Sequence, residues 1–180
     1  MKAYPYSLET DRLLLRSFEI SDRYRIYEIA GAREIYESTV SGHFPYNEDL
    51  AEGVVVMQQY RYFQGKRIPF AITLRDTGVL IGAVVLIVEK DFNRAEIGYW
   101  LGVSSWGRGY ATESAKAVLT YGFKELGYHR IYAWHMATNP ASGRVLQKIG
   151  LKHEGTYRDR VLKDGTYRDI KFYGMLNPYE

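Results

Sequence analysis

The sequence predicts an α/β (α+β) fold with a mixed, mostly antiparallel central sheet flanked by helices. Three strand-like apolar segments follow one another before residue 104 and are joined by short turns, a pattern that favours antiparallel pairing. A glycine-containing turn then leads into a long amphipathic helix, a further strand and a final hairpin. With 180 residues the chain is expected to form a single domain, residues 1–180, with a core of its own.

The N-terminal segment is expected to form a strand followed by a helix. The strand covers residues 11–18, and its three consecutive leucines, Leu13 to Leu15, favour burial on both faces. Ser21 and Asp22 are residue types that cap helix N-termini, and they predict a helix over residues 23–30. This start gives the sheet its first strand and one covering helix.

A second helix is expected after a loop at residues 38–46. Asn47 is a good N-cap residue, and the stretch that follows it has apolar residues at helical spacing. Such spacing predicts one apolar stripe against the core. The residues expected on that stripe are Leu50, Val54, Met57 and Tyr60.

The middle of the chain predicts three strands in succession. Residues 68–74 and 79–88 are apolar and are separated by a turn with Asp and Gly, a hairpin signal. Residues 94–103 form the third strand, in which successive side chains point to opposite faces. One face is expected to carry Glu96, Gly98 and Trp100, and the other Ala95, Ile97, Tyr99 and Leu101.

The turn from Trp106 to Thr112 is built to bind an anion. Gly107 and Gly109 permit positive φ and close approach of a ligand to the backbone. A helix starting near Ala111 would point its first unpaired N–H groups, and the positive end of its dipole, at that ligand. The Gly-Lys-Ser/Thr ending of a P-loop and the third glycine of a dinucleotide fold are missing. A structural turn without a ligand is the remaining alternative.

The C-terminal part predicts a strand, a short helix and a hairpin. The helix that starts near Ala111 is expected to end at Gly127, and residues 129–135 then form a strand. Asn139 caps the next helix, with Pro140 at its first position. Residues 151–160 and 166–176 are expected to pair as a hairpin.

From Arg94 to Leu176 the chain resembles the GNAT-superfamily N-acetyltransferases, specifically the RimJ/RimL-type, ribosomal-protein N-acetyltransferase-like branch. The matching motifs occur in the order of the branch: residues 95–101, 106–113, 139–142 and 145–155. The resemblance implies the GNAT acyl-CoA N-acyltransferase fold and acetyl-CoA as cosubstrate. Two residues depart from the wider superfamily pattern: Trp106 replaces a polar phosphate contact, and Leu146 occupies the position of a tyrosine that protonates the leaving group.

The resemblance also implies which residues bind the cofactor. The strand end would pair with the pantetheine arm and supply an oxyanion-stabilising N–H, the glycine turn would bind pyrophosphate, and the second helix would contact pantetheine. The implied cofactor-binding residues are Leu101, Gly102, Val103, Arg108, Gly109, Tyr110, Ala111, Thr112, Asn139 and Ser142. The alternative role of Asn139 and Ser142 is to hydrogen-bond backbone amides at the start of the helix, without any contact to the cofactor.

Two residues are candidates for the chemistry of acetyl transfer to an amine. Glu96 is the hypothesised general base, which would need burial to raise the pKa of its carboxyl; an exposed strand carboxylate without a catalytic role is the alternative. Ser142 is the hypothesised hydrogen-bond donor to the CoA sulfur. His43 lies in the loop expected over the acceptor site, where a surface histidine is the simpler interpretation.

Composition excludes several classes of protein. The chain has no cysteine, so it has neither a disulfide nor a thiol nucleophile, and its four histidines lack the close spacing of metal ligands. The net charge of +3 has no basic block, which argues against direct binding to nucleic acid. Residues 1–10 lack the apolar core of a signal, and no apolar run could span a bilayer. We expect a soluble, cytoplasmic protein without a metal, and a homodimer is compatible with the sequence.

The expected function is direct acetyl transfer from acetyl-CoA to a primary amine, without a covalent enzyme intermediate. The RimJ/RimL resemblance favours a protein N-terminal α-amino group as the acceptor, and residues 38–46 and 157–165 are the loops expected to select it. A small-amine acceptor, such as a polyamine, an aminoglycoside or another antibiotic, is one alternative. A non-catalytic acyl-CoA-binding module is another, and a nucleotide-binding module a third.

Overall fold

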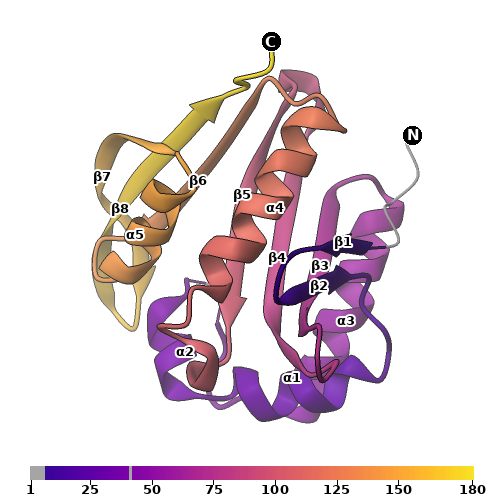
Figure 1. The fold of residues 1–180 in the computed structure, drawn as a ribbon. Coiled ribbons are helices and arrows are strands. Elements are labelled where there is room, and N and C mark those ends of the chain that lie inside the picture. The colour runs from indigo at the N-terminus through magenta and orange to yellow at the C-terminus, as the bar shows by residue number, and fades with distance from the viewer. Residues whose placement is uncertain (1–6, 41) are drawn as a thin grey trace.

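The computed structural model describes residues 7–40 and 42–180 and contains an eight-stranded sheet with helices on both faces (Figure 1). The strand order is β1-β2-β3-β4-β5-β6-β8-β7. Every neighbouring pair is antiparallel except β5 and β6, which are parallel. The predicted mixed, mostly antiparallel sheet is therefore confirmed.

The element boundaries define the architecture. The strands are β1 (Ser7–Glu9), β2 (Leu13–Arg16), β3 (Arg67–Leu74), β4 (Leu80–Glu89), β5 (Arg94–Leu101), β6 (Arg130–Met136), β7 (Lys152–Lys163) and β8 (Thr166–Leu176). The helices are α1 (Asp22–Ala30), α2 (Arg33–Ser38), α3 (Glu48–Phe63), α4 (Tyr110–Lys124) and α5 (Pro140–Lys148). Short 3₁₀ turns, η1 (Lys90–Phe92) and η2 (Val103–Ser105), flank β5.

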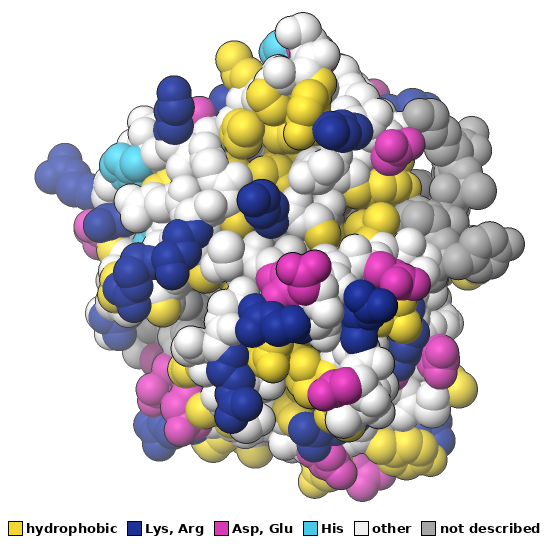
Figure 2. All heavy atoms as spheres, viewed as in Figure 1, with side chains coloured by type: hydrophobic (Ala, Val, Ile, Leu, Met, Phe, Trp, Pro, Cys, Tyr) yellow, Lys and Arg dark blue, Asp and Glu magenta, His cyan; other side chains and the backbone are white. Residues whose placement is uncertain are grey.

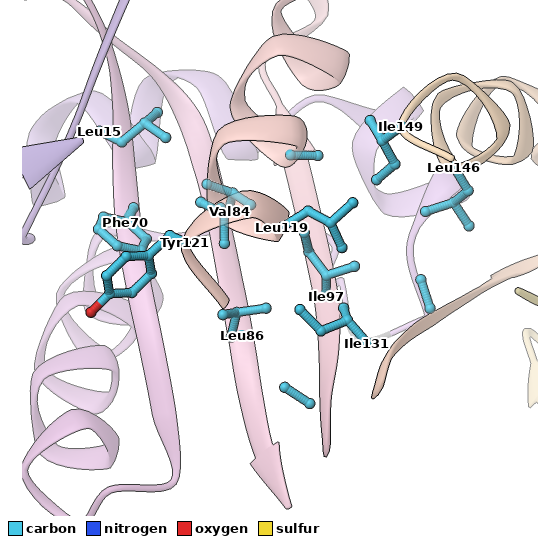
Figure 3. Packing of buried hydrophobic residues seen from close by; sticks show 14 of the residues in the cluster. Leu15, Phe70, Val84, Leu86, Ile97, Leu119, Tyr121, Ile131, Leu146 and Ile149 are labelled. Atoms are coloured by element: carbon cyan, nitrogen blue, oxygen red, sulfur yellow. The ribbon is translucent and has the colours of Figure 1, made fainter. Parts of the chain in front are cut away.

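The main core lies between the sheet and the helices α4 and α5. Figure 3 shows Leu119 of α4 above Ile97 of β5, with Leu146 of α5 farther along the same layer. The Phe70 ring meets Tyr121 edge-on at 6.2 Å between centroids. Side chains from helices and strands interdigitate here, so the hydrophobic effect fixes α4 across the middle of the sheet.

A smaller core covers the opposite face of the sheet. It includes Ile26 of α1, Val55 of α3, and Ala71 and Ala83 from β3 and β4, with Trp100 of β5 packed at its edge. The two cores account for the alternation along β5, because the residues of one face meet α4 while those of the other meet α1 and α3. The expected division of β5, with Glu96 and Trp100 on the face away from α4, is confirmed.

Local capping signals positioned several elements correctly. The Asn47 side chain accepts a hydrogen bond from the Leu50 N–H at 2.9 Å and begins α3. Asn139 accepts from the Ser142 N–H at 3.1 Å and begins α5, with Pro140 at the first position. These contacts involve only neighbours in sequence, which is why the residue types alone predict them.

The structure corrects the predicted start of the chain. In place of one strand over residues 11–18, β1 and β2 form a short hairpin, and Leu14 is half-buried while Leu13 and Leu15 are buried. Ser21 makes no side-chain capping bond. The Asp22 carboxylate instead accepts from the Glu19 N–H at 2.8 Å and from Arg16. The acidic residue at the helix start therefore bonds to the backbone and the arginine that precede it, and Ser21 does not serve as a side-chain cap.

The predicted apolar stripe of α3 is displaced by one position. The buried residues are Ala51 and Val55, whereas Met57 and Tyr60 are 46% and 55% exposed. Val54 of the predicted stripe packs against the smaller core, so the period is correct and the fully buried line runs one residue later, through Ala51 and Val55. The final hairpin also differs, since β7 reaches Lys163 rather than ending at residue 160.

Two expectations concern the chain ends and the membrane. Among the described residues, no helix is both long enough and apolar enough to cross a bilayer. The expectation that residues 1–10 carry no signal core falls in part on residues 1–6, which lie outside the described residues. The loop expected at residues 38–46 is irregular apart from the end of α2, and residue 41 within it is likewise not described.

Candidate active site

The site is organised by the divergence of β5 from β6. These parallel strands pair only from Arg94 to Glu96, opposite Arg130 to Tyr132. Beyond Glu96, β5 continues beside β4 to Leu101, while β6 continues beside β8. Figure 1 shows the two strands separating toward the end of the sheet where α4 begins. The wedge between them, here called the splay, leaves two strand edges facing each other, as a strand-like ligand would require.

The backbone of β5 presents alternate residues to the splay. The Gly102 N–H donates to the Ile81 carbonyl at 2.9 Å, so it is used within the sheet. Because bonded and non-bonded pairs alternate along an antiparallel ladder, the N–H groups of Tyr99 and Leu101 point the other way, into the splay. The Leu101 carbonyl accepts from the Trp106 indole at 2.8 Å. Of the predicted strand-end donors, Leu101 is the one that the ladder directs at the splay.

The start of α4 has the geometry of an anion site. Gly107 and Gly109 have φ of 73° and 83°, in the left-handed region that glycine adopts without strain. Gly109 supplies no side-chain cap, so the N–H groups of Tyr110, Ala111 and Thr112 have no partner within the helix. These free donors and the helix dipole fit a pyrophosphate.

The surface around this helix start is positively charged in places. Figure 2 views the molecule from the α4 side and shows Lys and Arg side chains near the lower end of α4, where the helix begins. Arg108 is exposed in the turn itself. Acidic side chains are interspersed over the same face, which fits a local anion site better than an extended nucleic-acid surface.

The glycine turn is braced by the N-terminal hairpin. Arg12 donates to the Arg108 carbonyl at 3.0 Å and, through Nε, to the Glu113 carboxylate at 2.7 Å. The Thr10 hydroxyl donates to the same carboxylate at 2.6 Å. Burial raises the pKa of Glu113, but these hydrogen bonds outweigh it and hold the pKa below that of an ordinary glutamate. Sequence reasoning missed Arg12, since it lies 96 positions before Arg108 in the chain.

Glu96 lies at the apex of the splay, as the last residue of β5 that pairs with β6. It is half-buried on the face opposite α4. Burial raises the pKa of its carboxyl, while hydrogen bonds with Trp134 and Tyr132 lower it in part. The single Tyr132 proton goes to Glu89, which leaves the Trp134 indole as the neighbouring donor to Glu96. A carboxyl with a raised pKa at this position can accept a proton from an amine.

Ser142 and Tyr99 connect the two sides of the splay. The Tyr99 hydroxyl of β5 donates to the Ser142 carbonyl, in the first turn of α5, at 3.0 Å and lies at the same distance from the Ser142 hydroxyl. Burial raises the pKa of Tyr99 to about 12, so its proton stays on at neutral pH. The two hydroxyls form a proton-donating pair on the α4 side. Tyr99 was not singled out as a site residue from sequence, although its place on the strand before the turn was a usable signal.

Asn139 has less freedom than the sequence suggested. Its amide oxygen accepts from the Ser142 N–H, and its amide nitrogen donates to the Ser38 carbonyl at 3.1 Å. The capping role is therefore present in the structure, and a contact to pantetheine stays a prediction. Leu146 is buried in the core, which removes the usual tyrosine position from the chemistry.

Two of the histidines have hydrogen-bond partners of their own. His135 is buried on β6, bonded through Nδ1 to the Met136 carbonyl at 2.8 Å, and burial lowers its pKa. His129 pairs with Glu180 near the C-terminus. Among residues 7–40 and 42–180, no cluster of His, Asp and Glu is arranged to hold a metal ion, and the absence of a metal stays a prediction.

Comparison with known proteins identifies the family. The Acetyltransferase (GNAT) domain family matches residues 12–152, most of the chain. The uncharacterized N-acetyltransferase YoaA of Bacillus subtilis is 34% identical over 176 residues, which are 96% of this chain and 98% of that protein. The chain belongs to the GNAT acetyltransferase family.

Further relatives at lower identity include ribosomal-protein N-acetyltransferases. The [ribosomal protein uS5]-alanine N-acetyltransferase of Escherichia coli is 25% identical over 177 residues, covering 95% of this chain and 91% of that protein. A solved RimL structure, a ribosomal L7/L12 α-N-protein acetyltransferase in complex with coenzyme A, superposes with a TM-score of 0.86 at 19% identity. The superposition covers 98% of this chain and 99% of the RimL chain. At that identity the likeness concerns the fold.

Membership of the family establishes the reaction class. GNAT acetyltransferases use acetyl-CoA, so this chain is an acetyl-CoA-dependent N-acetyltransferase. The enzyme class and the resemblance predicted from sequence are confirmed.

Proposed function

We propose that this N-acetyltransferase acetylates the α-amino group of a protein N-terminus. The observation that carries the proposal is Glu96, a half-buried carboxyl of raised pKa at the apex of the splay. An α-amino group has a pKa near 7.7–8.0, so part of it is neutral at physiological pH, unlike a lysine or polyamine nitrogen near 10.4. A glutamate base is therefore better matched to an α-amine. The relationship to the uS5-alanine enzyme supports the same acceptor class.

In the proposed mechanism the acetyl donor and the amine meet at the apex of the splay. The start of α4 binds the pyrophosphate, and the edge of β5 holds the pantetheine arm. The amine nitrogen attacks the thioester carbonyl carbon, the new C–N bond forms, and Glu96 accepts the amine proton. The Leu101 N–H, directed into the splay, donates to the carbonyl oxygen as it gains charge.

The leaving group is proposed to receive its proton from the hydroxyl pair. As the C–S bond breaks, the Ser142 hydroxyl gives its proton to the CoA thiolate, and the Tyr99 proton turns from the Ser142 carbonyl to the Ser142 oxygen. Tyr99 regains a proton from solvent as the products leave. The 3.0 Å contact between the two hydroxyls supports this relay. The pair would replace the tyrosine that other family members carry where this chain has Leu146.

An acceptor panel tests the proposal. The purified enzyme and acetyl-CoA are combined with a peptide beginning with alanine, the same peptide with a blocked N-terminus and an internal lysine, spermidine, and an aminoglycoside. We expect thiol release and a single acetyl group on the α-nitrogen of the free peptide, located by fragmentation mass spectrometry. Turnover confined to spermidine or the aminoglycoside would replace the proposal with a small-amine function. Acetyl-CoA binding without any thiol release across the panel would count against it as well.

A further inference from the structure

A row of aligned residues crosses the sheet on the face of Glu96. The backbone partner of Arg67 is Ile87, and the partner of Ile87 is Glu96. Directly opposed residues on neighbouring strands point to the same face. Arg67 and Glu96 therefore share one face, two strand spacings or roughly 9.6 Å apart along the row. Their side chains are long enough to approach a common ligand above Ile87.

Along this row the side chains are more exposed to solvent than those on the α4 face of the same strands. Val85, Ile87, Glu96 and Gly98 are half-buried, while their neighbours facing α4 are mostly buried. A Cβ built on Gly98 would meet only Val85 Cγ1, at 3.6 Å, an ordinary contact. The lack of a side chain at Gly98 thus leaves space beside Glu96. We call this strip of partly exposed residues the acceptor trough; its members are Arg67, Val85, Ile87, Glu96 and Gly98.

Arg67 brings to the trough hydrogen-bond donors that no described residue accepts. Its guanidinium is half-buried, and within residues 7–40 and 42–180 it has no hydrogen-bond or ion-pair partner, whereas Arg94 on the same face binds Glu89 at 2.7 Å. Burial lowers the pKa of Arg67, nearby Arg61 adds to this, and Glu96 opposes it. An arginine stays charged in proteins and carries five N–H donors in a fixed plane. Such a group beside a base fits an oxygen atom of the substrate.

We propose that Arg67 is a specificity-determining residue that binds the carbonyl oxygen next to the reacting amine. The acceptor is then an α-amino acyl group, with its nitrogen at Glu96 and its carbonyl oxygen at Arg67. This inference rests on the proposed function and deepens it. A polyamine lacks the carbonyl, and its second cation would be repelled by Arg67 and Arg61.

A different role for Arg67 gives a different result. Arg67 could act only through its charge, which favours the ionised form of Glu96. Removing it would then shift the acid limb of the pH profile for every acceptor alike. A contact to the substrate carbonyl affects only acceptors that have one. Comparing matched acceptors therefore separates the two roles.

The test compares Arg67→Met, Arg67→Lys and the wild-type enzyme. The acceptors are an alanine-starting peptide, free alanine, and an alkylamine of the same carbon skeleton without the carbonyl. We expect R67M to lower kcat/KM for the peptide by roughly 10- to 100-fold, the range for losing a hydrogen bond to a charged group, mainly through KM. The ratio of mutant to wild-type rates for the alkylamine should stay near one, with R67K in between. Peptide binding to the CoA-loaded enzyme, measured by calorimetry, should weaken in parallel.

The outcomes distinguish this inference from the proposed function. Equal losses for peptide and alkylamine, or a pH shift alone, would overturn the carbonyl contact while leaving N-terminal acetylation standing. Arg67-dependent turnover of free alanine without turnover of the peptide would keep the contact and overturn the protein acceptor. Wild-type activity on spermidine alone would overturn both. Arg23→Met, which removes a partly exposed arginine of α1 that pairs with Glu52, serves as the control for a general loss of positive charge.

Discussion

At the scale of single residues, the two faces of β5 divide the chemistry. Glu96 points to the face where the acceptor trough lies, and Tyr99 points to the α4 side with Ser142. Odd spacing along one strand thus places a proton acceptor and a proton donor on opposite sides of the reacting carbonyl. The amine can therefore lose its proton to Glu96 while the thiolate gains a proton from the hydroxyl pair, so the two steps do not need the same group.

The Glu96→Gln variant should lose the general base. We expect kcat/KM to fall by about 10²- to 10⁴-fold, the usual contribution of general acid–base catalysis, with acetyl-CoA affinity unchanged. Because burial raises the Glu96 pKa, the wild-type rate should fall with acid at a higher pH than an ordinary glutamate would give. Below that pKa the carboxyl is protonated and cannot accept a proton. E96Q should lack this limb.

The pH–rate profiles of wild type, E96Q and Glu52→Gln check the assignment of the base. Glu52 is an exposed carboxylate on α3, paired with Arg23, and its removal should leave the profile unchanged. An E96Q enzyme that keeps both its rate at neutral pH and its acid limb would show that Glu96 is only a structural strand carboxylate.

The Tyr99→Phe and Ser142→Ala variants should each impair thiolate protonation. We expect each to lower kcat by about 10²-fold, the lower end of the range for acid catalysis, with little change in KM. Because the hydroxyls act in series, the double variant should lose hardly more than either single one. Single-turnover thiol release measures the step directly. Independent, multiplying losses would contradict a relay between the two groups.

Distance along the chain decides which site residues sequence can predict. The glycine turn and the Asn139 cap are local, so their residue types indicate their geometry. Arg67 and Glu96 share a face only because β4 lies between them, and Tyr99 meets Ser142 only across the splay. Proximity of this kind is set by strand register, which one sequence does not specify.

At the scale of elements, the position of α5 against β6 depends on the absence of a side chain at Gly143. A Cβ at Gly143 would lie 2.6 Å from His135 Nε2 and 3.3 Å from the Tyr173 hydroxyl. The His135 ring is buried and cannot move away easily. The close approach of α5 to the sheet is what brings Ser142 to Tyr99. Helix position and catalytic geometry are therefore coupled.

The Gly143→Ala variant should be less stable by about 1–3 kcal/mol, the usual consequence of overpacking. The shift of α5 should also lower kcat by lengthening the Ser142–Tyr99 contact. Gly53→Ala is the matched control, because nothing lies within 4 Å of a Cβ at this exposed position inside α3. It should gain about 0.5–1 kcal/mol from helix propensity. Urea unfolding of both variants measures the difference, and equal stabilities would contradict the packing argument.

Local sequence patterns are enough to predict most helices and strands, but not which side of a helix is buried. Strand and helix types from β3 to α5 follow from period and turn residues, since each signal is local. The stripe of α3 was assigned to the wrong residues because Leu50 and Ala51 both fit a helical period. Ala51 and Val55 are the fully buried pair, and tertiary packing in the smaller core decides which residues of α3 face the sheet.

At the scale of the whole molecule, the two loops expected over the acceptor are fastened to each other. The Lys163 ammonium, at the tip of the β7–β8 hairpin, donates to the carbonyls of Tyr36 and Thr39 at the end of α2. The Tyr36 hydroxyl donates to Asp164, and the ammonium lies 4.0 Å from the Tyr36 ring centroid. Asn139 ties the same loop to α5. These contacts join three segments that are far apart in sequence: the end of α2, the tip of the β7–β8 hairpin and the start of α5.

The Lys163→Met variant should loosen this closure while the cofactor site stays intact. It removes a cation that satisfies two helix-end carbonyls and keeps most of the apolar stem. We expect KM for the peptide acceptor to rise by about three- to tenfold, on the order of one hydrogen bond, with acetyl-CoA affinity unchanged. Amide hydrogen exchange should quicken in residues 36–40 and 160–166 and nowhere near α4. Lys152→Met, at the exposed far end of β7, is the control. If acetyl-CoA affinity falls together with the peptide KM, the contact supports the whole site and not the acceptor side alone.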